Sequence, residues 1–74
     1  MLFPNPFSDY IDVRGLQNVA TLTVYSYTGA TLITENIISQ SEMRMATETL
    51  PSGIYFVKLT NQDGSAKQFK MLKK

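Results

Sequence analysis

The sequence predicts an all-β domain built from two antiparallel sheets packed face to face. Short β-prone runs recur along the chain, and Gly, Pro, Asn and Asp, which mark turns, separate them. Apolar and polar residues alternate inside these runs, as they do in strands that are buried on one face. The chain has 74 residues, of which 43% are hydrophobic, and no linker or repeat divides it. We therefore expect one domain over residues 1–74, with about six or seven short strands that suit a sandwich better than a small open barrel.

The first part of the chain is expected to hold two strands. Residues 3–7, Phe-Pro-Asn-Pro-Phe, should be extended, because each proline disfavours helical geometry in the residue before it. Residues 8–13 form a strand and residues 15–18 a turn. Residues 20–27 form the clearest strand, which is rich in β-branched and aromatic side chains. Its alternation predicts that one face carries Ala20, Leu22 and Val24.

Two hairpins are expected in the rest of the chain. Gly29 supplies a turn between residues 20–27 and a returning strand at 31–38. A second turn at 61–64, Asn-Gln-Asp-Gly, joins strands at 54–60 and 66–72. In the first of these two strands, Tyr55, Val57 and Leu59 should line one face, and Ile54 and Phe56 the other.

Residues 39–50 fit two patterns. Ser39 followed by Glu42 resembles a helix capping box, and several residues after it are fair helix formers. Against a helix, methionines alternate with charged residues over 43–46, as in a strand. We favour a short strand at 43–46, followed by one irregular or helical turn into Pro51.

Charge is distributed unevenly although the whole chain carries a net charge of only +1. Residues 1–57 hold two arginines against five carboxylates, a net charge of −3, and residues 58–74 hold five lysines against one aspartate, a net charge of +4. The last strand should direct Phe69 and Met71 to the core and leave its lysines in water. Either the lysines protect a sheet edge from pairing, or they form a positive patch that a partner recognises.

The residue inventory points away from catalysis, metals and cofactors. The chain has no cysteine and no histidine, so it lacks thiolate ligands and the commonest general base. A pair such as Ser65 and Lys67 lies beside a turn with no pocket indicated, and Asp9 and Asp12 should point to opposite faces of a strand. No apolar run is long enough to span a bilayer. No signal peptide is recognisable at the start.

Some aromatic residues are candidates for a binding surface. Phe69 is the one aromatic residue among the lysines of the last strand, and a nucleic-acid stacking platform needs several, so no nucleic-acid partner is expected. Tyr25 and Tyr27 share a face, and Tyr55 is expected near them. Exposed tyrosines of this kind bind sugars or protein partners, but in a small sandwich they are more often partly buried sheet residues.

Three segments together carry a resemblance to a known family. They are Phe3-Pro4-Asn5-Pro6-Phe7, then residues 24–33 (Val-Tyr-Ser-Tyr-Thr-Gly-Ala-Thr-Leu-Ile), and then residues 50–59 (Leu-Pro-Ser-Gly-Ile-Tyr-Phe-Val-Lys-Leu) with Gly64 and a basic end after them. In this order and spacing they resemble the type A C-terminal sorting domain of cargo proteins of the type IX secretion system of certain Gram-negative bacteria. The chain departs from the family pattern before the turn at Gly29, where an acidic or amide residue is common, and over 43–49, which is less plainly β than usual.

The resemblance implies an immunoglobulin-like sandwich of about seven strands and a targeting role. It implies a domain excised from a larger exported protein, whose cargo passes through the periplasm and an outer-membrane translocon to the cell surface or the medium. It also implies partners, namely that translocon and a sortase-like peptidase that removes the domain. Dimerisation through an edge strand stays open. By resemblance, the residues that the translocon recognises are Pro51, Gly53, Tyr55, Gly64, Lys67, Lys70, Lys73 and Lys74. A generic immunoglobulin-like or fibronectin-like interaction module, or a carbohydrate-binding accessory module, is the alternative.

Overall fold

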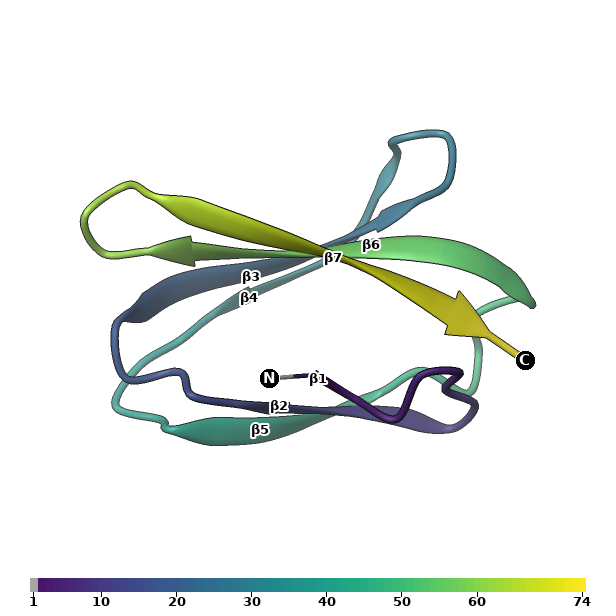
Figure 1. Cartoon of the computed structure of the whole chain (residues 1–74), viewed down its shortest axis with the longest axis horizontal. Helices are drawn as coiled ribbons and strands as arrows, with labels where there is room; N and C mark the ends of the chain where they lie inside the picture. The colour runs from purple at the N-terminus through teal and green to yellow at the C-terminus, as the bar shows by residue number, and fades with distance from the viewer. Residues whose placement is uncertain (1) are drawn as a thin grey trace.

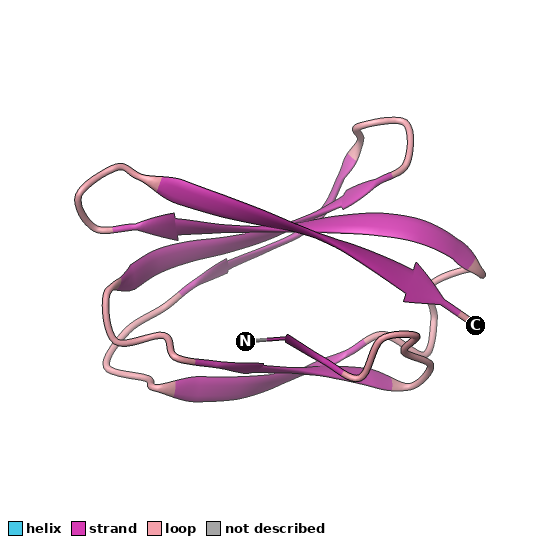
Figure 2. Cartoon of the chain, viewed as in Figure 1, coloured by secondary structure: helices cyan, strands magenta, loops and turns pink. Residues whose placement is uncertain are grey.

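The computed structural model describes residues 2–74, and these residues form seven strands and no helix (Figures 1 and 2). One sheet has three strands in the order β1-β2-β5, and the other has four in the order β4-β3-β6-β7. All neighbouring strands are antiparallel, and the two sheets face each other in Figure 1. This arrangement confirms the predicted all-β sandwich. The strands are β1 (Leu2–Phe3), β2 (Tyr10–Arg14), β3 (Val19–Ser26), β4 (Thr31–Asn36), β5 (Glu42–Ala46), β6 (Gly53–Asn61) and β7 (Ala66–Lys73).

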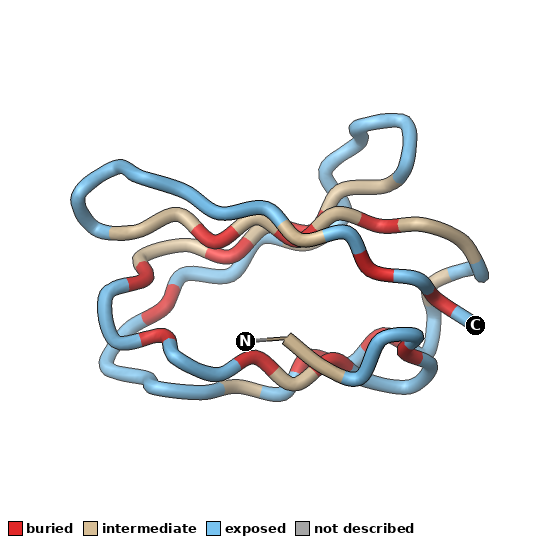
Figure 3. Tube along the Cα trace, viewed as in Figure 1, coloured by how far each residue is buried: buried red, intermediate tan, exposed pale blue. Residues whose placement is uncertain are grey.

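The core lies between the sheets and is built by period-two alternation. Leu22 and Val24 on β3 and Val57 on β6 are fully buried, as the sequence predicts for their faces. Figure 3 shows buried positions recurring along strands of both sheets, while the tip of the β6–β7 hairpin is exposed. The buried apolar residues are Phe7, Ile11, Val13, Leu16, Val19, Leu22, Val24, Ile37, Met45, Tyr55, Val57, Leu59 and Met71.

Both predicted hairpin turns are confirmed. At the first, the Gly29 amide donates to the Ser26 carbonyl at 2.9 Å, and the Ser26 amide donates to the Ala30 carbonyl at 2.9 Å. At the second, the Gly64 amide donates to the Asn61 carbonyl at 3.0 Å. Gly64 has a φ of 92°, a conformation that a side chain disfavours, so the turn requires glycine there.

The ambiguous stretch is a strand followed by a turn, as favoured. β5 pairs with β2 from Arg14 opposite Glu42 to Tyr10 opposite Ala46. Met45 faces the core, and a turn follows in which the Leu50 amide donates to the Thr47 carbonyl at 3.0 Å. A strand forms here despite the capping-box pattern. A helix over these residues would leave the backbone groups at this edge of β2 without hydrogen-bond partners.

The prediction of an extended segment at residues 3–7 is wrong. Pro4 and Pro6 both follow cis peptide bonds, and the chain bends. Phe3 pairs with Asp12 in the three-stranded sheet, whereas Phe7 forms a parallel bridge with Lys73 in the four-stranded sheet. The segment therefore crosses from one layer to the other within a few residues, and it places the fully buried Phe7 side chain in the core.

Two strand details also differ from expectation. Ala20 was expected on the core face of its strand, but a register shift between Val19 and Thr21 gives that place to Val19, which is buried while Ala20 is only half-buried. The strand expected over 31–38 ends at Asn36. Ile37 beyond it is buried, and its amide still donates to the Ala20 carbonyl at 2.9 Å.

Candidate recognition surface

The residues that the resemblance singled out lie around the β6–β7 hairpin, which spans residues 53–73. The β6–β7 register sets Gly53 opposite Lys73 and Leu59 opposite Lys67. The structure divides the residues into two groups. Pro51, Gly64, Lys67, Lys70 and Lys74 are exposed, whereas Tyr55 and Lys73 are buried and Gly53 is half-buried.

Tyr55 holds the start of β6 in place from inside the sandwich. Its ring is buried and packs against the Phe7 ring, with centroids 6.0 Å apart and planes tilted by 60°. Its hydroxyl donates to the Pro51 carbonyl oxygen at 2.5 Å. Tyr55 thereby joins the loop before β6 to the core, and its side chain is not offered to the outside.

Tyr55 stands opposite Ser26, so it lies near Tyr25 and Tyr27 as expected, but its side chain lies on the other face of the sheet. Tyr25 stands opposite Phe56, which faces outward on β6, and Tyr27 is 71% exposed beyond the end of β3. Tyr55 occupies the other face of the sheet because it neighbours Phe56 in a strand, where successive side chains alternate. No three-tyrosine platform forms.

Gly53 opens β6 with a φ of 148°. This conformation is one that L side chains rarely adopt, although a Cβ at this position would meet no atom within 4 Å. Glycine is therefore required here by backbone geometry and not by close packing. Its position opposite Lys73 aligns the start of β6 with the end of the chain.

Lys73 corrects the expectation that the lysines of the last strand all stay in water. Only 7% of Lys73 is exposed. Its Nζ donates to the Thr47 carbonyl at 3.1 Å and to the Ser8 carbonyl, and it lies 5.7 Å from the centroid of the Phe7 ring. The physical reason is position: Phe69, Met71 and Lys73 alternate along β7 and all face inward. Carbonyl oxygens at the sandwich end replace the water that the ammonium group loses.

Asn5 and Phe7 also bind the backbone at the end of β7. The Phe7 amide donates to the Leu72 carbonyl at 2.8 Å, and the Lys74 amide donates to the Phe7 carbonyl at 2.9 Å. Asn5 Oδ1 accepts from the Leu72 amide at 3.1 Å. Both segments stand out in the sequence, but nothing in it predicts that they contact each other. The signal in the sequence for a segment that covers a strand edge was the polar Asn5 between two prolines, followed by the large apolar Phe7.

The remaining lysines form the positive surface. Lys67, Lys70 and Lys74 are exposed, and Lys58 is half-buried on β6. Strand alternation and register place Lys70 beside Phe56 and Lys58 beside Gln68 on the outer face of the four-stranded sheet. The outer face of the hairpin therefore carries two cations, of which Lys70 lies beside the apolar Phe56.

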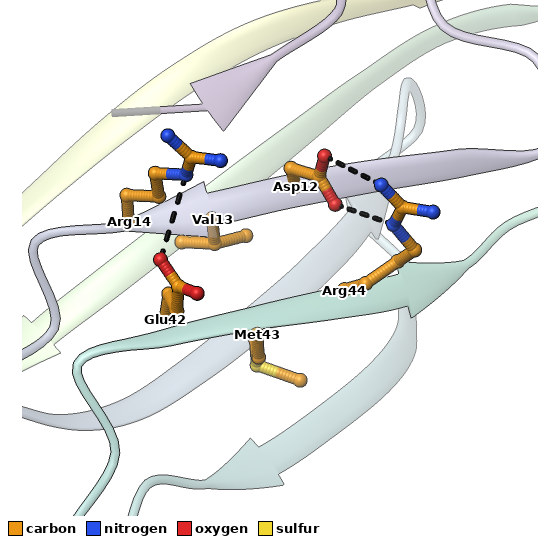
Figure 4. Close-up of a pocket in the computed structure, with 6 residues that line it drawn as sticks. All are labelled: Asp12, Val13, Arg14, Glu42, Met43 and Arg44. Atoms are coloured by element: carbon orange, nitrogen blue, oxygen red, sulfur yellow. Dashed lines mark hydrogen bonds and ion pairs between the residues drawn. The ribbon is translucent and has the colours of Figure 1, made fainter.

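The outer face of the three-stranded sheet carries paired charges. Arg44 donates to both carboxylate oxygens of Asp12, from Nε at 2.7 Å and from Nη2 at 3.1 Å, and Arg14 Nε lies 3.6 Å from Glu42 Oε2 (Figure 4). The Arg44 hydrogen bond holds the pKa of Asp12 below its usual value of 3.8. Since both carboxylates already have cationic partners, this shallow pocket does not present a free acid or base for chemistry. It is lined by Asp12, Val13, Arg14, Glu42, Met43 and Arg44.

Residues 2–74 hold no cluster of three or more carboxylate, histidine or cysteine side chains that could bind a metal ion. The same residues contain no helix long and apolar enough to cross a membrane.

The comparison with known families agrees with the motifs. The profile of the secretion system C-terminal sorting domain matches residues 1–74, the whole chain. Neither a search of curated proteins nor a search of solved structures finds a match. Domains of this family are non-catalytic sorting tags, and the two-sheet sandwich has the architecture expected from the resemblance. The chain therefore belongs to the secretion system C-terminal sorting domains, and it is a type IX secretion signal whose cargo is exported to the cell surface or secreted.

Proposed function

We propose that this domain directs a folded cargo from the periplasm through the outer-membrane translocon of the type IX system, and that a sortase-like peptidase at the surface then removes it. In this proposal the domain is one part of a larger exported protein and does no chemistry of its own. The observation that carries the proposal is the family match over the full chain. The exposed lysines on the paired β6–β7 hairpin support it, since they give a protein partner a charged surface to recognise.

In this proposal the eight predicted recognition residues have two kinds of role, according to their exposure and their backbone geometry. Pro51, Lys67, Lys70 and Lys74 are exposed and are available to touch the translocon. The remaining four act through the fold. Gly53 and Gly64 permit backbone geometries, Tyr55 holds the Pro51 loop, and Lys73 closes the end of the sandwich.

Recognition is proposed to depend on the folded shape. Lys67 and Lys70 are exposed on β7, the half-buried Lys58 lies on the adjacent β6, and the β6–β7 ladder fixes their relative positions. In an unfolded chain the same side chains would sample many arrangements, and a partner would have to overcome that entropy on binding. A preformed surface avoids this cost.

The experiment is a fusion of residues 1–74 to the C-terminus of a folded passenger that carries its own inner-membrane export signal, expressed in a bacterium with a type IX system. We expect the passenger at the cell surface or in the medium, and its mass should show loss of the domain. The passenger without the domain, and the fusion in a strain without the translocon, should both stay in the periplasm. Retention of the intact fusion in the normal strain would overturn the proposal and favour a generic interaction module.

Truncation of the tail is a poor test of the recognised lysines. Deleting residues 70–74 would also remove the core residue Met71 and the buried Lys73. Replacing Lys70 and Lys74 with glutamine removes exposed charge and leaves the core intact. We expect this double variant to fold normally and to be exported less than the parent. Unchanged export would show that these two lysines are not contacts.

A further inference from the structure

The outer edge of β7 is only partly covered. In an antiparallel pair, residues that exchange backbone hydrogen bonds with the partner strand alternate with residues whose N–H and C=O point away. The Asn61 amide donates to the Ser65 carbonyl at 2.7 Å, which fixes the phase of the β6–β7 ladder. From the register, the odd-numbered residues of β7 bond to β6. The backbone groups of Ala66, Gln68, Lys70 and Leu72 therefore point to the free edge.

The N-terminal crossing segment covers one half of this edge. Both backbone groups of Leu72 are bonded there, to Asn5 Oδ1 and to the Phe7 amide. Lys70 has only its carbonyl engaged, by Asn5 Nδ2 at 3.5 Å. For the Lys70 amide and for both groups of Gln68 and Ala66, no partner exists among residues 2–74. An open edge of about five residues, Ala66–Lys70, is left.

The open part of the edge is flanked by cations on both sides. Lys67 and Lys70 are three residues apart on a strand, so they project from opposite faces, and both are exposed. The single carboxylate of the hairpin, Asp63, is engaged within the turn, where its Oδ1 accepts from the Ser65 hydroxyl at 2.6 Å and from the Ser65 amide at 2.9 Å. No free acid in the hairpin offsets these lysines.

The edge strand at the other side of the same sheet differs in charge. β4 carries Glu35 and no lysine or arginine. The edge strand β5 of the second sheet carries Glu42 and Arg44, and both are ion-paired. Among these three edges, β7 alone combines unpaired backbone groups with exposed, unpaired cations on both faces.

We propose that the open edge of β7, Ala66–Lys70, accepts an extended, carboxylate-bearing segment of the secretion machinery as an added β-strand. The proposal rests on the proposed export function for the identity of the partner. Main-chain hydrogen bonds to the outward groups of Gln68 and Lys70 would supply affinity, and carboxylates beside Lys67 and Lys70 would supply specificity. A second copy that pairs through its own β7 is a poor occupant, because that edge would bring the same lysines and no free carboxylate.

The first test uses the isolated domain and a short peptide of alternating valine and glutamate with blocked ends. We expect slower amide exchange at Gln68 and Lys70 by NMR, and binding that weakens as salt is raised. The counterpart peptide with lysine for each glutamate should not bind. Absence of binding by the acidic peptide, or protection that maps to β4 instead, would overturn the proposal.

Two variants locate the contact. Gln68→Pro removes an outward N–H and no bond of the β6–β7 ladder, so we expect it to fold and to bind the acidic peptide about tenfold more weakly. Thr34→Pro on β4 is the matched control. The Ile37 amide donates to the Ala20 carbonyl, which fixes the phase of the β3–β4 ladder, and in that phase the backbone N–H of Thr34 also points to the free edge. It should bind like the parent. Equal binding by Gln68→Pro and the parent would refute the edge as the contact.

The same variants belong in the passenger fusion. We expect Gln68→Pro and the double variant Lys67→Glu/Lys70→Glu to lower export at least tenfold, and Thr34→Pro to leave it unchanged. The double variant keeps the result interpretable if the proline variant fails to fold. Normal export by both edge variants would refute the edge while the export function stands. Failure of the parent fusion would refute the function, and the peptide experiment would still decide whether the edge binds acidic strands.

Discussion

Replacing Lys73 with methionine removes the buried ammonium group and keeps most of the apolar stem. The change deletes two charge-assisted hydrogen bonds, to the carbonyls of Thr47 and Ser8. Such bonds contribute about 1.5–3 kcal/mol each. Both carbonyls keep another donor, because Thr47 Oγ1 bonds the Ser8 carbonyl at 3.0 Å and the Leu50 amide bonds the Thr47 carbonyl at 3.0 Å. The variant also no longer has to bury a charge, which offsets a further part of the lost hydrogen-bond energy. We therefore expect the free energy of unfolding to fall by about 2 kcal/mol.

Urea unfolding of the isolated domain measures this loss. For a chain of this size the free energy of unfolding is about 4–11 kcal/mol, so the expected loss is a large fraction of it. The melting temperature should fall by roughly 8–16 °C. Lys74→Met is the matched control, since it removes the same charge from the exposed neighbouring lysine and should change stability by less than about 0.5 kcal/mol. Equal midpoints for the two variants would refute the structural role of Lys73.

Three further predictions concern stability. Tyr55→Phe removes the hydrogen bond to the Pro51 carbonyl, and urea unfolding should show a loss of about 1 kcal/mol. Gly64→Ala should cost about 1–2 kcal/mol in the same assay, because no atom lies within 4 Å of the added Cβ and only the φ of 92° opposes it. The Arg44 hydrogen bond lowers the folded-state pKa of Asp12 below 3.8, so its contribution is present above that pH and is lost as pH falls through the lowered value. Acid unfolding should therefore depend less steeply on pH in Asp12→Asn, and an unchanged acid limb would contradict the assignment.

Local pattern was sufficient for most of the sandwich. Period-two alternation identified the inward faces of β3 and β6 because those strands are long and their turns carry glycine at the required positions. The same alternation favours a strand over a helix at 43–46, and the structure confirms that strand. Alternation from Phe69 and Met71 also indicated that Lys73 faces inward, but the expectation that lysines stay in water prevailed.

Contacts that join distant segments could not be predicted from the sequence. The acceptors for Lys73 are backbone carbonyls of Ser8 and Thr47, which carry no sequence signal. The bidentate pair of Asp12 with Arg44 depends on the β2–β5 register across 32 positions of the chain. The chain bends between Phe3 and Phe7 because these residues connect the two sheets. That connection is set by the topology of the whole domain, and the local propensities of residues 3–7 do not reveal it.

The central claim is that the folded surface, and not a linear terminal sequence, is what the secretion machinery recognises. Export of the passenger fusion carrying Leu22→Asp tests it most directly, because Leu22 is fully buried and lies outside every motif described above. A carboxylate there should unfold the domain, whereas Thr34→Asp at an exposed position should not. With export measured as a fraction of the passenger made, we expect Thr34→Asp to match the parent and Leu22→Asp to remain in the periplasm. Export of Leu22→Asp at the parent level, with its unfolding confirmed, would contradict the claim.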